Sequence, residues 1–153
     1  MSRVKQYMMR TLNSISRDDS ISHAIRFMHK TEMSVLPVVD EENKFLGTIY
    51  SNNILKNIIP ERYGFLETHR VLYEINQSAE NLEEIKDRQV GDYMSEKAVA
   101  VEENDRMDRI AEIMLHNEES IVFVTNKRGN LRGYVSRADL LFYLLDVAEG
   151  AEM

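Results

Sequence analysis

The stretch Val4-Lys5-Gln6-Tyr7-Met8 returns later in the chain as Val90-Gly91-Asp92-Tyr93-Met94, and this repeat decides the fold. The offset is 86 residues, the distance from Met8 to Met94, and it continues without a gap. Further pairs matched at this offset are Met28 and Met114, Ser34 and Ser120, Val38 and Val124, Gly47 and Gly133, and Leu55 and Leu141. An internal repeat restricts the possible folds to those built from repeated units. Two long copies predict two pseudo-symmetric αβ units packed on each other, with clefts at their seam where ligands can bind.

The first copy predicts the element order β-α-β-β-α. The continuous apolar run at 35–39 is typical of a strand buried on both faces. The residues before the first helix offer Asp19 or Ser20 as its N-cap. The expected elements are a strand over 12–15, a helix from about 20 to 33, strands over 35–39 and 45–50, and a helix that Ser51 caps and Pro60 ends.

The second copy predicts the same order. Its expected elements are strands over 98–101, 121–125 and 131–136 and helices over 105–116 and 137–147. Between the copies, the segment 61–89 shows a helical face with a break near Asn76-Gln77-Ser78 and a second helix beyond it. This segment is either a helical hairpin packed on the core or a surface for a dimer or partner. We therefore expect an α+β fold with a first unit at 3–59, a helical linker at 60–89 and a second unit at 90–148.

Composition excludes several classes of protein. The chain has 153 residues, 43% of them hydrophobic, which is enough to bury a core. It has no cysteine, which excludes disulfides and favours a reducing cytoplasm. The N-terminus shows no apolar signal segment, and no apolar run approaches the roughly 20 residues that span a bilayer. The net charge of −7 argues against a nucleic-acid partner. We expect a cytoplasmic protein with no membrane partner.

The motif Gly-x-x-Ser-x-x-Asp at 133–139 joins an expected strand to an expected helix. In one interpretation Ser136 is the helix N-cap and Asp139 completes a capping box. In the other, the helix N-terminus faces an anion, Ser136 donates a hydrogen bond to it, and Asp139 accepts from the two hydroxyls of a ribose. Because Ser-x-x-Asp is a common pattern, the motif by itself leaves both interpretations open.

Together with the repeated β-α-β-β-α order and the Leu-Pro-Val-Val-Asp strand at 36–40, this motif resembles the cystathionine-β-synthase (CBS) domain family. The resemblance is to a tandem pair of CBS domains, a Bateman module, and it covers about residues 3–59 and 89–147. It implies a regulatory binding module with two pseudo-symmetric clefts. In this family the clefts hold adenosine-containing ligands such as AMP, ADP, ATP, S-adenosylmethionine or cyclic di-adenylate, and the acid of the motif takes the ribose hydroxyls.

The resemblance assigns the first cleft to an intact motif. Its expected residues are Ser136, Arg137 and Asp139 of the second unit and Thr11, Asn13, Met33, Ser34 and Val35 of the first unit. We expect the regulatory ligand here, and no other cofactor.

The second cleft departs from the family pattern, since Tyr50 replaces the small hydroxyl residue and Asn53 replaces the acid. A neutral amide lacks the charged, two-oxygen acceptor that a carboxylate offers, and the Tyr50 ring has the size to fill the pocket. The opposite wall of this cleft is expected at Lys97, Val99, Ser120 and Ile121. We expect a degraded cleft that is empty, weak or adapted to another ligand.

Acidic residues precede both buried strands, at Glu32 and at Glu118-Glu119. Carboxylates repel a polyphosphate where screening is poor. This ranks AMP, S-adenosylmethionine and cyclic di-adenylate above ATP.

The expected function is therefore a sensor of an adenosyl ligand that signals to an effector protein. The resemblance also implies a homodimer. The helical faces that we expect at its interface rather than in the core are Ile21, Ile25 and Met28, and Met107, Ile110 and Met114. The alternative is a ligand-free adaptor that only dimerises, which Tyr50 and Asn53 favour. Neither metal-site spacing nor a catalytic constellation stands out, so we expect no metal and no enzyme.

Overall fold

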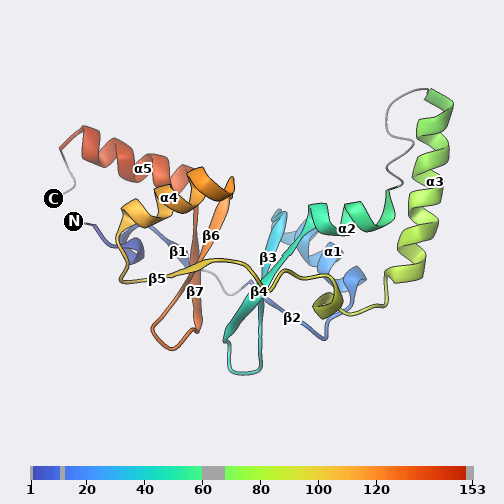
Figure 1. The fold of residues 1–153 in the computed structure, drawn as a ribbon, viewed down its shortest axis with the longest axis horizontal. Coiled ribbons are helices and arrows are strands. Elements are labelled where there is room, and N and C mark those ends of the chain that lie inside the picture. The colour runs from blue at the N-terminus through green and yellow to red at the C-terminus, as the bar shows by residue number, and fades with distance from the viewer. Residues whose placement is uncertain (1, 11–12, 60–67, 151–153) are drawn as a thin grey trace.

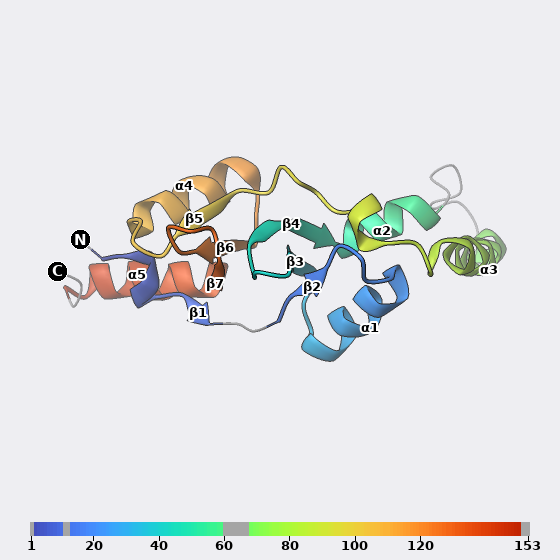
Figure 2. The same cartoon turned by 90° about the horizontal axis from the view of Figure 1, so that it is seen from below.

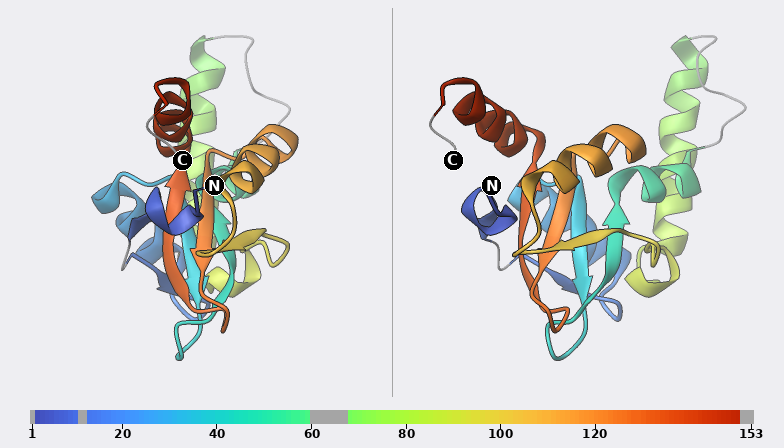
Figure 3. Two further views of the ribbon diagram at one scale, coloured as in Figure 1. Left: turned by 90° about the vertical axis from the view of Figure 1, so that its left-hand side faces the viewer. Right: turned by 60° about the vertical axis from the view of Figure 1, so that its left-hand side comes forward.

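The computed structural model describes residues 2–10, 13–59 and 68–150, and it consists of two units side by side along the long axis of the molecule (Figures 1 and 2). Helix α5 (Arg137–Ala148) lies at one end of this axis and helix α3 (Thr68–Ile85) at the other. The sheets of the two units stand next to each other in the middle, with helices at one end of their strands and hairpin turns at the other (Figure 3).

The first unit is a three-stranded sheet with two helices. Its elements are β2 (Ile15–Ser16), α1 (Ile21–Thr31), β3 (Val35–Val39), β4 (Phe45–Tyr50) and α2 (Ser51–Ile58). Strand β3 lies in the centre, parallel to β2 and antiparallel to β4. The predicted strands over 35–39 and 45–50 are confirmed. Of the predicted strand over 12–15, Leu12 lies outside the described residues, and β2 begins only at Ile15.

The second unit repeats this arrangement and gains one strand. Its elements are β5 (Ala100–Glu102), α4 (Met107–Asn117), β6 (Ile121–Thr125), β7 (Leu131–Ser136) and α5. The sheet order is β1-β7-β6-β5, in which β1 (Met9–Arg10) comes from the N-terminal end of the chain. The predicted strands over 121–125 and 131–136 are confirmed, whereas β5 lies two residues later at its start than the predicted 98–101.

The helix caps follow local chemistry. The Ser20 side chain accepts a hydrogen bond from the His23 N–H at 3.1 Å and caps α1 as predicted. Helix α1 ends before the predicted residue 33, because Glu32 adopts a left-handed conformation with φ of 57°. The prediction that Ser51 caps α2 is wrong. Strand β4 runs through Tyr50 directly into α2, so Tyr50 holds the N-cap position and Ser51 is already helical.

Helix α3 is continuous from Thr68 to Ile85, so the predicted break near Asn76-Gln77-Ser78 is wrong. The helix contains neither glycine nor proline, and polar residues alone do not interrupt a helix that is held by packing. Its C-terminal part packs on the first unit, where Leu82 contacts the core and the Asn81 amide donates to the Ile58 carbonyl at 2.9 Å. The segment 60–67 of the predicted linker lies outside the described residues.

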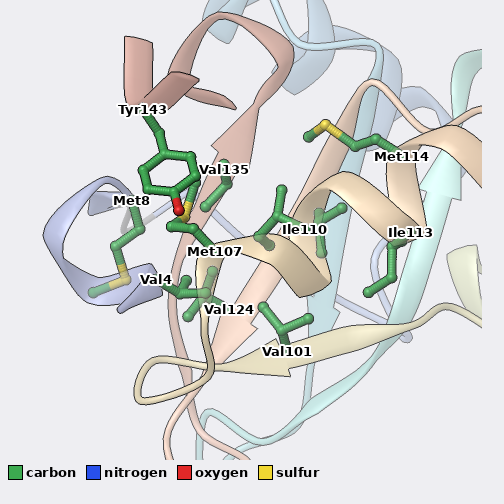
Figure 4. Close-up of a cluster of buried hydrophobic side chains, with 11 residues drawn as sticks. Val4, Met8, Val101, Met107, Ile110, Ile113, Met114, Val124, Val135 and Tyr143 are labelled. Atoms are coloured by element: carbon green, nitrogen blue, oxygen red, sulfur yellow. The ribbon is translucent and has the colours of Figure 1, made fainter. Parts of the chain in front are cut away.

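The two lead-ins, residues 4–8 and 90–94, are exchanged between the units, an arrangement that the repeat alone does not predict. Val4 and Met8 lie in the core of the second unit with Val101, Met107 and Ile110 (Figure 4). Val90 is buried in the core of the first unit, and Tyr93 and Met94 pack against that core. Each lead-in includes a short 3-10 helix, at Val4–Gln6 and Val90–Asp92. Neither unit therefore completes its core without the other.

The two repeat-related glycines make this exchange possible. Strand β1 crosses β7 so closely that a Cβ atom on Gly133 would collide with the backbone carbonyl of Met9. At the equivalent place in the first unit, a Cβ on Gly47 would collide with the carbonyl of Ser95. Glycine is required at both positions because the obstacle is backbone, which cannot move aside as a flexible side chain can.

The seam between the units is apolar. We call the residues that fill it the seam cluster: Val35, Phe123 and Leu131 are buried, and Val39, Phe45, Tyr50, Ile121 and Tyr134 pack around them. The rings of Phe45 and Phe123 lie 5.8 Å apart between centroids. Burial of this apolar surface fixes the two sheets face to face.

The helical faces predicted at a dimer interface belong to the interior of the chain. Ile21 and Met28 of α1 are buried in the core of the first unit, and Ile25 packs against the same core. Met107, Ile110 and Met114 of α4 are buried in the core of the second unit. The prediction is wrong because each helix uses this face to cover its own sheet and the exchanged lead-in.

Candidate functional site

The predicted ribose-binding turn lies where β7 ends and α5 begins. The Ser136 N–H and the Ser136 hydroxyl both lie 2.9 Å from Oδ2 of Asp139, and the Asp139 N–H donates to the Ser136 hydroxyl at 3.3 Å. This is a capping box, so the structural interpretation of the motif is realised. Both bonds to the carboxylate use Oδ2. A carboxylate has about four acceptor positions, so the cap leaves Asp139 capacity to accept from a ligand.

The register of the sheet places this turn on the seam side. Ser136 pairs with Ile121 at the start of β6, and Tyr134 pairs with Phe123. Ile121, Phe123 and Tyr134 all belong to the seam cluster, and alternate residues of a strand share a face. Ser136 therefore shares the face of β7 that meets the first unit.

Arg137 is the first residue of α5 and is exposed. Its backbone N–H donates to the Ser120 carbonyl at 3.2 Å, and its guanidinium donates to the Glu118 carbonyl at 3.3 Å. These bonds hold the start of α5 against the start of β6. The charged head remains exposed at the start of α5.

The predicted wall of the first cleft comes from the turn between α1 and β3. Met33 packs against the core of the first unit, and Val35 is buried in the seam cluster. Ser34 between them is exposed, and its carbonyl accepts from the Ser51 N–H at 2.8 Å. Asn13 is half-buried, and Thr11 lies outside the described residues. Within the described part of the chain, the hydrogen bonds of the Ser136 and Asp139 side chains stay inside their own turn and do not reach this wall.

In the second cleft, Tyr50 reaches across the seam. Its ring belongs to the seam cluster, and its hydroxyl lies 3.1 Å from each carboxylate oxygen of Glu119, to which it donates. Burial, and beyond it the charge and hydrogen bond of Glu119, raise the pKa of the Tyr50 phenol. The Asn53 amide donates to the backbone carbonyl of Tyr93. Glu119 and Tyr93 were not among the predicted site residues, although a comparison of the two copies of the repeat could have pointed to both.

The remaining residues of the second cleft are less enclosed. Lys97, Val99 and Ser120 are exposed, whereas Ile121 packs in the seam cluster. The structure thus brings Tyr50 and Ile121 together in one cluster and leaves Lys97 in solvent.

Two cavities lie between helices, away from the seam. One has a volume of about 710 Å³ and lies between α1, α2 and α3, and the other, of about 620 Å³, lies between α4 and α5. The repeat relates them, since Met28, Glu32, Ile54 and Leu55 line the first and Met114, Glu118, Leu140 and Leu141 line the second. Met33 and Ser34 also line the first cavity, and Arg137 lines the second.

Two further properties concern the described residues alone. They contain no group of three or more histidine or acidic side chains arranged to hold a metal ion. Among them, no helix has both the length and the apolar character needed to cross a lipid bilayer.

The fold and the seam define the class of this protein: a fused pair of repeat-related β-α-β-β-α units, packed through their sheets and completed by exchanged lead-ins. The chain belongs to the CBS domain family, because a sequence model of the CBS domain matches residues 4–60 and again residues 90–146. This confirms the resemblance and the expected α+β fold.

Several proteins similar to this chain match it over nearly its whole length. A CBS domain-containing protein of Dictyostelium discoideum is 29% identical over 146 residues, which cover 95% of this chain and 93% of that protein. A CBS domain-containing protein of unknown function from Bacillus anthracis has the same fold with a TM-score of 0.76 at 20% identity, covering 95% and 94% of the two chains. CBSX2, solved in complex with AMP, matches with a TM-score of 0.71 at 16% identity, covering 97% and 99%; a further CBSX2 structure comes from Arabidopsis thaliana.

Proposed function

We propose that this chain is a regulatory binding module, without catalytic activity, that takes an adenosine-containing ligand in the first cleft. The observation that carries this proposal is the Ser136–Asp139 turn at the seam edge of β7, where a hydroxyl, a carboxylate and a helix N-terminus come together. A ribose diol suits the carboxylate, and a phosphate suits the hydroxyl and the helix N-terminus. The AMP complex of CBSX2, a protein of the same fold, supports this class of ligand.

The internal repeat supports the composition of the first cleft. Tyr50 and Glu119 touch across the seam, and the 86-residue offset carries them to Ser136 and Met33. Pseudo-symmetry therefore supports a first cleft formed by the motif of the second unit and the α1–β3 turn of the first unit. A ligand that contacts both units stabilises their relative orientation to the extent that it binds that orientation better.

The charges near this cleft support a ligand with few phosphates. Glu32 and Glu118 end the helices that precede the buried strands, and Arg137 is the cation at the motif itself. We therefore rank AMP, S-adenosylmethionine and cyclic di-adenylate above ATP. The absence of cysteine supports a reducing compartment such as the cytoplasm.

The test is isothermal titration of nucleotide-free protein with AMP, ATP, S-adenosylmethionine and cyclic di-adenylate, alongside the Asp139→Ala variant. We expect micromolar binding of one of them and at least about tenfold weaker binding by Asp139→Ala. The matched control is Ser20→Ala, which removes the equivalent kind of helix cap from α1 and leaves the cleft intact. Equal loss of binding in both variants would assign the effect to helix stability rather than to the ligand.

The alternative function is a ligand-free adaptor that only dimerises. The observation that favours it is the capping box, since Asp139 has a structural task without any ligand. Absence of heat with all four ligands, in protein free of bound nucleotide, would decide for this alternative.

A homodimer forms part of the proposed function. Helix α5 is apolar on more than one side, and Leu141 and Phe142 are 66% and 59% exposed, with Leu115 of α4 beside them at 79%. Leu55, the repeat equivalent of Leu141, is exposed on α2. The chain thus carries equivalent exposed apolar surfaces on α5 and on α2. In a two-fold symmetric dimer, a second copy of the chain would cover these surfaces with its own. Light scattering of the purified chain measures the oligomeric state directly.

A further inference from the structure

The second cleft contains a contact that joins the two units without any ligand. Tyr50 ends β4 in the first unit, and Glu119 lies in the second unit between the end of α4 at Asn117 and the start of β6 at Ile121. The Tyr50 hydroxyl lies 3.1 Å from both oxygens of Glu119, and the Tyr50 ring packs among Val35 and Ile121 in the seam cluster. Both side chains are partly shielded from water. In such an environment a hydrogen bond to a charged acceptor is stronger than it is in solvent.

Asn53, the residue that replaces the ribose-binding acid in this cleft, has a structural task. Its amide nitrogen donates to the backbone carbonyl of Tyr93, in the lead-in that completes the first unit. A carboxylate at this position has no proton to donate and would repel the carbonyl oxygen. An amide is therefore suited to this contact in a way that an acid is not.

The first cleft differs at each equivalent position. The repeat relates Tyr50 to Ser136, Asn53 to Asp139 and Glu119 to Met33. Ser136 is too short to cross the seam, and a thioether does not replace a carboxylate as its acceptor. The second cleft thus contains a hydrogen bond across the seam, whereas the first cleft contains the short Ser136 hydroxyl and the Asp139 carboxylate.

We propose that Tyr50 and Glu119 form a built-in clasp that fills the second cleft, so that the chain binds a single ligand in the first cleft. The ligand count rests on the proposed function, whereas the clasp does not. The clasp holds the units together on one side at all times. A ligand in the first cleft then acts only on the opposite side of the seam. There it changes the relative orientation of the two units as far as the clasp does not fix it.

The first experiment tests the clasp without a ligand. Urea unfolding is measured for the native chain, Tyr50→Phe, Glu119→Gln and the double variant. We expect each single change to raise the unfolding equilibrium constant, and the double variant to raise it little more than the larger single change does, a coupling of about tenfold. Tyr134→Phe is the matched control, since it removes a hydroxyl from the same seam cluster, and its combination with Glu119→Gln should be additive. Additive effects for Tyr50 and Glu119 would overturn the clasp.

The second experiment counts ligands, with radiolabelled AMP in equilibrium dialysis. We expect one AMP per native chain and, in a Tyr50→Ser variant with a native circular dichroism spectrum, a second and weaker binding event. Two AMP molecules per native chain would overturn the closed cleft and leave the proposed function standing. One AMP per chain in both proteins would contradict the proposal that the Tyr50 ring fills the second cleft. No AMP bound to the native chain would count against AMP in the proposed function, and the unfolding cycle would still decide the clasp.

Discussion

The backbone N–H of Phe45 donates to the carbonyl of Gly129 at 2.9 Å, which ties the hairpin turn of the first unit to that of the second. The repeat-related hydrogen bond runs from the second unit to the first, since the Leu131 N–H donates to the Asn43 carbonyl at 3.0 Å. Two reciprocal bonds between equivalent residues are what a two-fold axis requires. The hairpin end of the seam is thus closed symmetrically, and the asymmetry between the clefts arises at the opposite end of the strands.

The seam predicts a stability effect at its aromatic pair. Phe45→Ala removes a ring that lies 5.8 Å from Phe123 and leaves a gap between the sheets. We expect a loss of about 2 kcal/mol or more in unfolding free energy, measured by urea titration. Ile75→Ala on α3, whose side chain is 59% exposed, is the control and should lose less than about 0.5 kcal/mol. Equal losses would contradict the seam as a source of stability.

The exchanged lead-ins predict an effect at a glycine. In Gly133→Ala the new methyl group meets the Met9 carbonyl, so β1 must leave β7 or the sheet must deform. We expect a loss of about 2 kcal/mol or more and increased amide hydrogen exchange in residues 4–10. Gly91→Ala provides a milder comparison, because its closest neighbours would lie 3.2 Å away and include a flexible arginine side chain. Unchanged exchange in residues 4–10 would show that the crossing is not tight.

The two interpretations of Asp139 are separable with Asp139→Asn. An amide oxygen can still accept from the Ser136 N–H, but it lacks the charge and the second acceptor oxygen. We expect thermal stability to fall by no more than about 1 kcal/mol while affinity for the adenosyl ligand falls about tenfold or more. Parallel calorimetry of unfolding and binding measures both. A variant that loses stability but keeps its affinity would leave Asp139 with the capping role only.

Tyr50 predicts a pH dependence at the alkaline end. Burial first, and then Glu119, raise the pKa of its phenol above the ordinary value of 10.0. Because the folded state holds this proton more tightly than the unfolded state, the stabilisation is complete below pH 10.0 and is lost as the pH rises through the higher folded-state pKa. The difference in unfolding free energy between the native chain and Tyr50→Phe should therefore shrink above that pH. Urea titrations at neutral and alkaline pH measure it, and a constant difference would contradict the prediction.

The exposed face of α5 predicts an effect on assembly. Leu141→Glu places a charge on a side chain that is 66% exposed, so the monomer should keep its stability within about 0.5 kcal/mol. If α5 faces a second copy, the same change should shift the mass seen by light scattering from dimer to monomer. Glu149→Gln, at the solvent-exposed end of the same helix, should leave the mass unchanged. A dimer that tolerates Leu141→Glu would place the interface elsewhere.

Local patterns were sufficient for much of the fold. The apolar run at 35–39 and its repeat at 121–125 lie in the strands predicted for them, because a strand buried on both faces reads as continuous apolar sequence. Ser20 caps its helix as its side chain suggests. The prediction failed at Ser51, whose position depends on how far β4 continues, and at Asn76, where polar residues continue the helix because neither glycine nor proline interrupts it.

The sequence by itself determined that the chain has two equivalent units, where their central strands lie and which motif departs from the other. Repetition and periodicity are local in the chain, so they can be read without coordinates. Only the tertiary structure decided that Val4 completes the second unit and Val90 the first, that Tyr50 bonds to Glu119, and that the apolar face of α4 is core whereas α5 is exposed. These facts depend on which surfaces meet in space. Burial and hydrogen bonding between distant segments set them, and neither leaves a pattern in neighbouring residues.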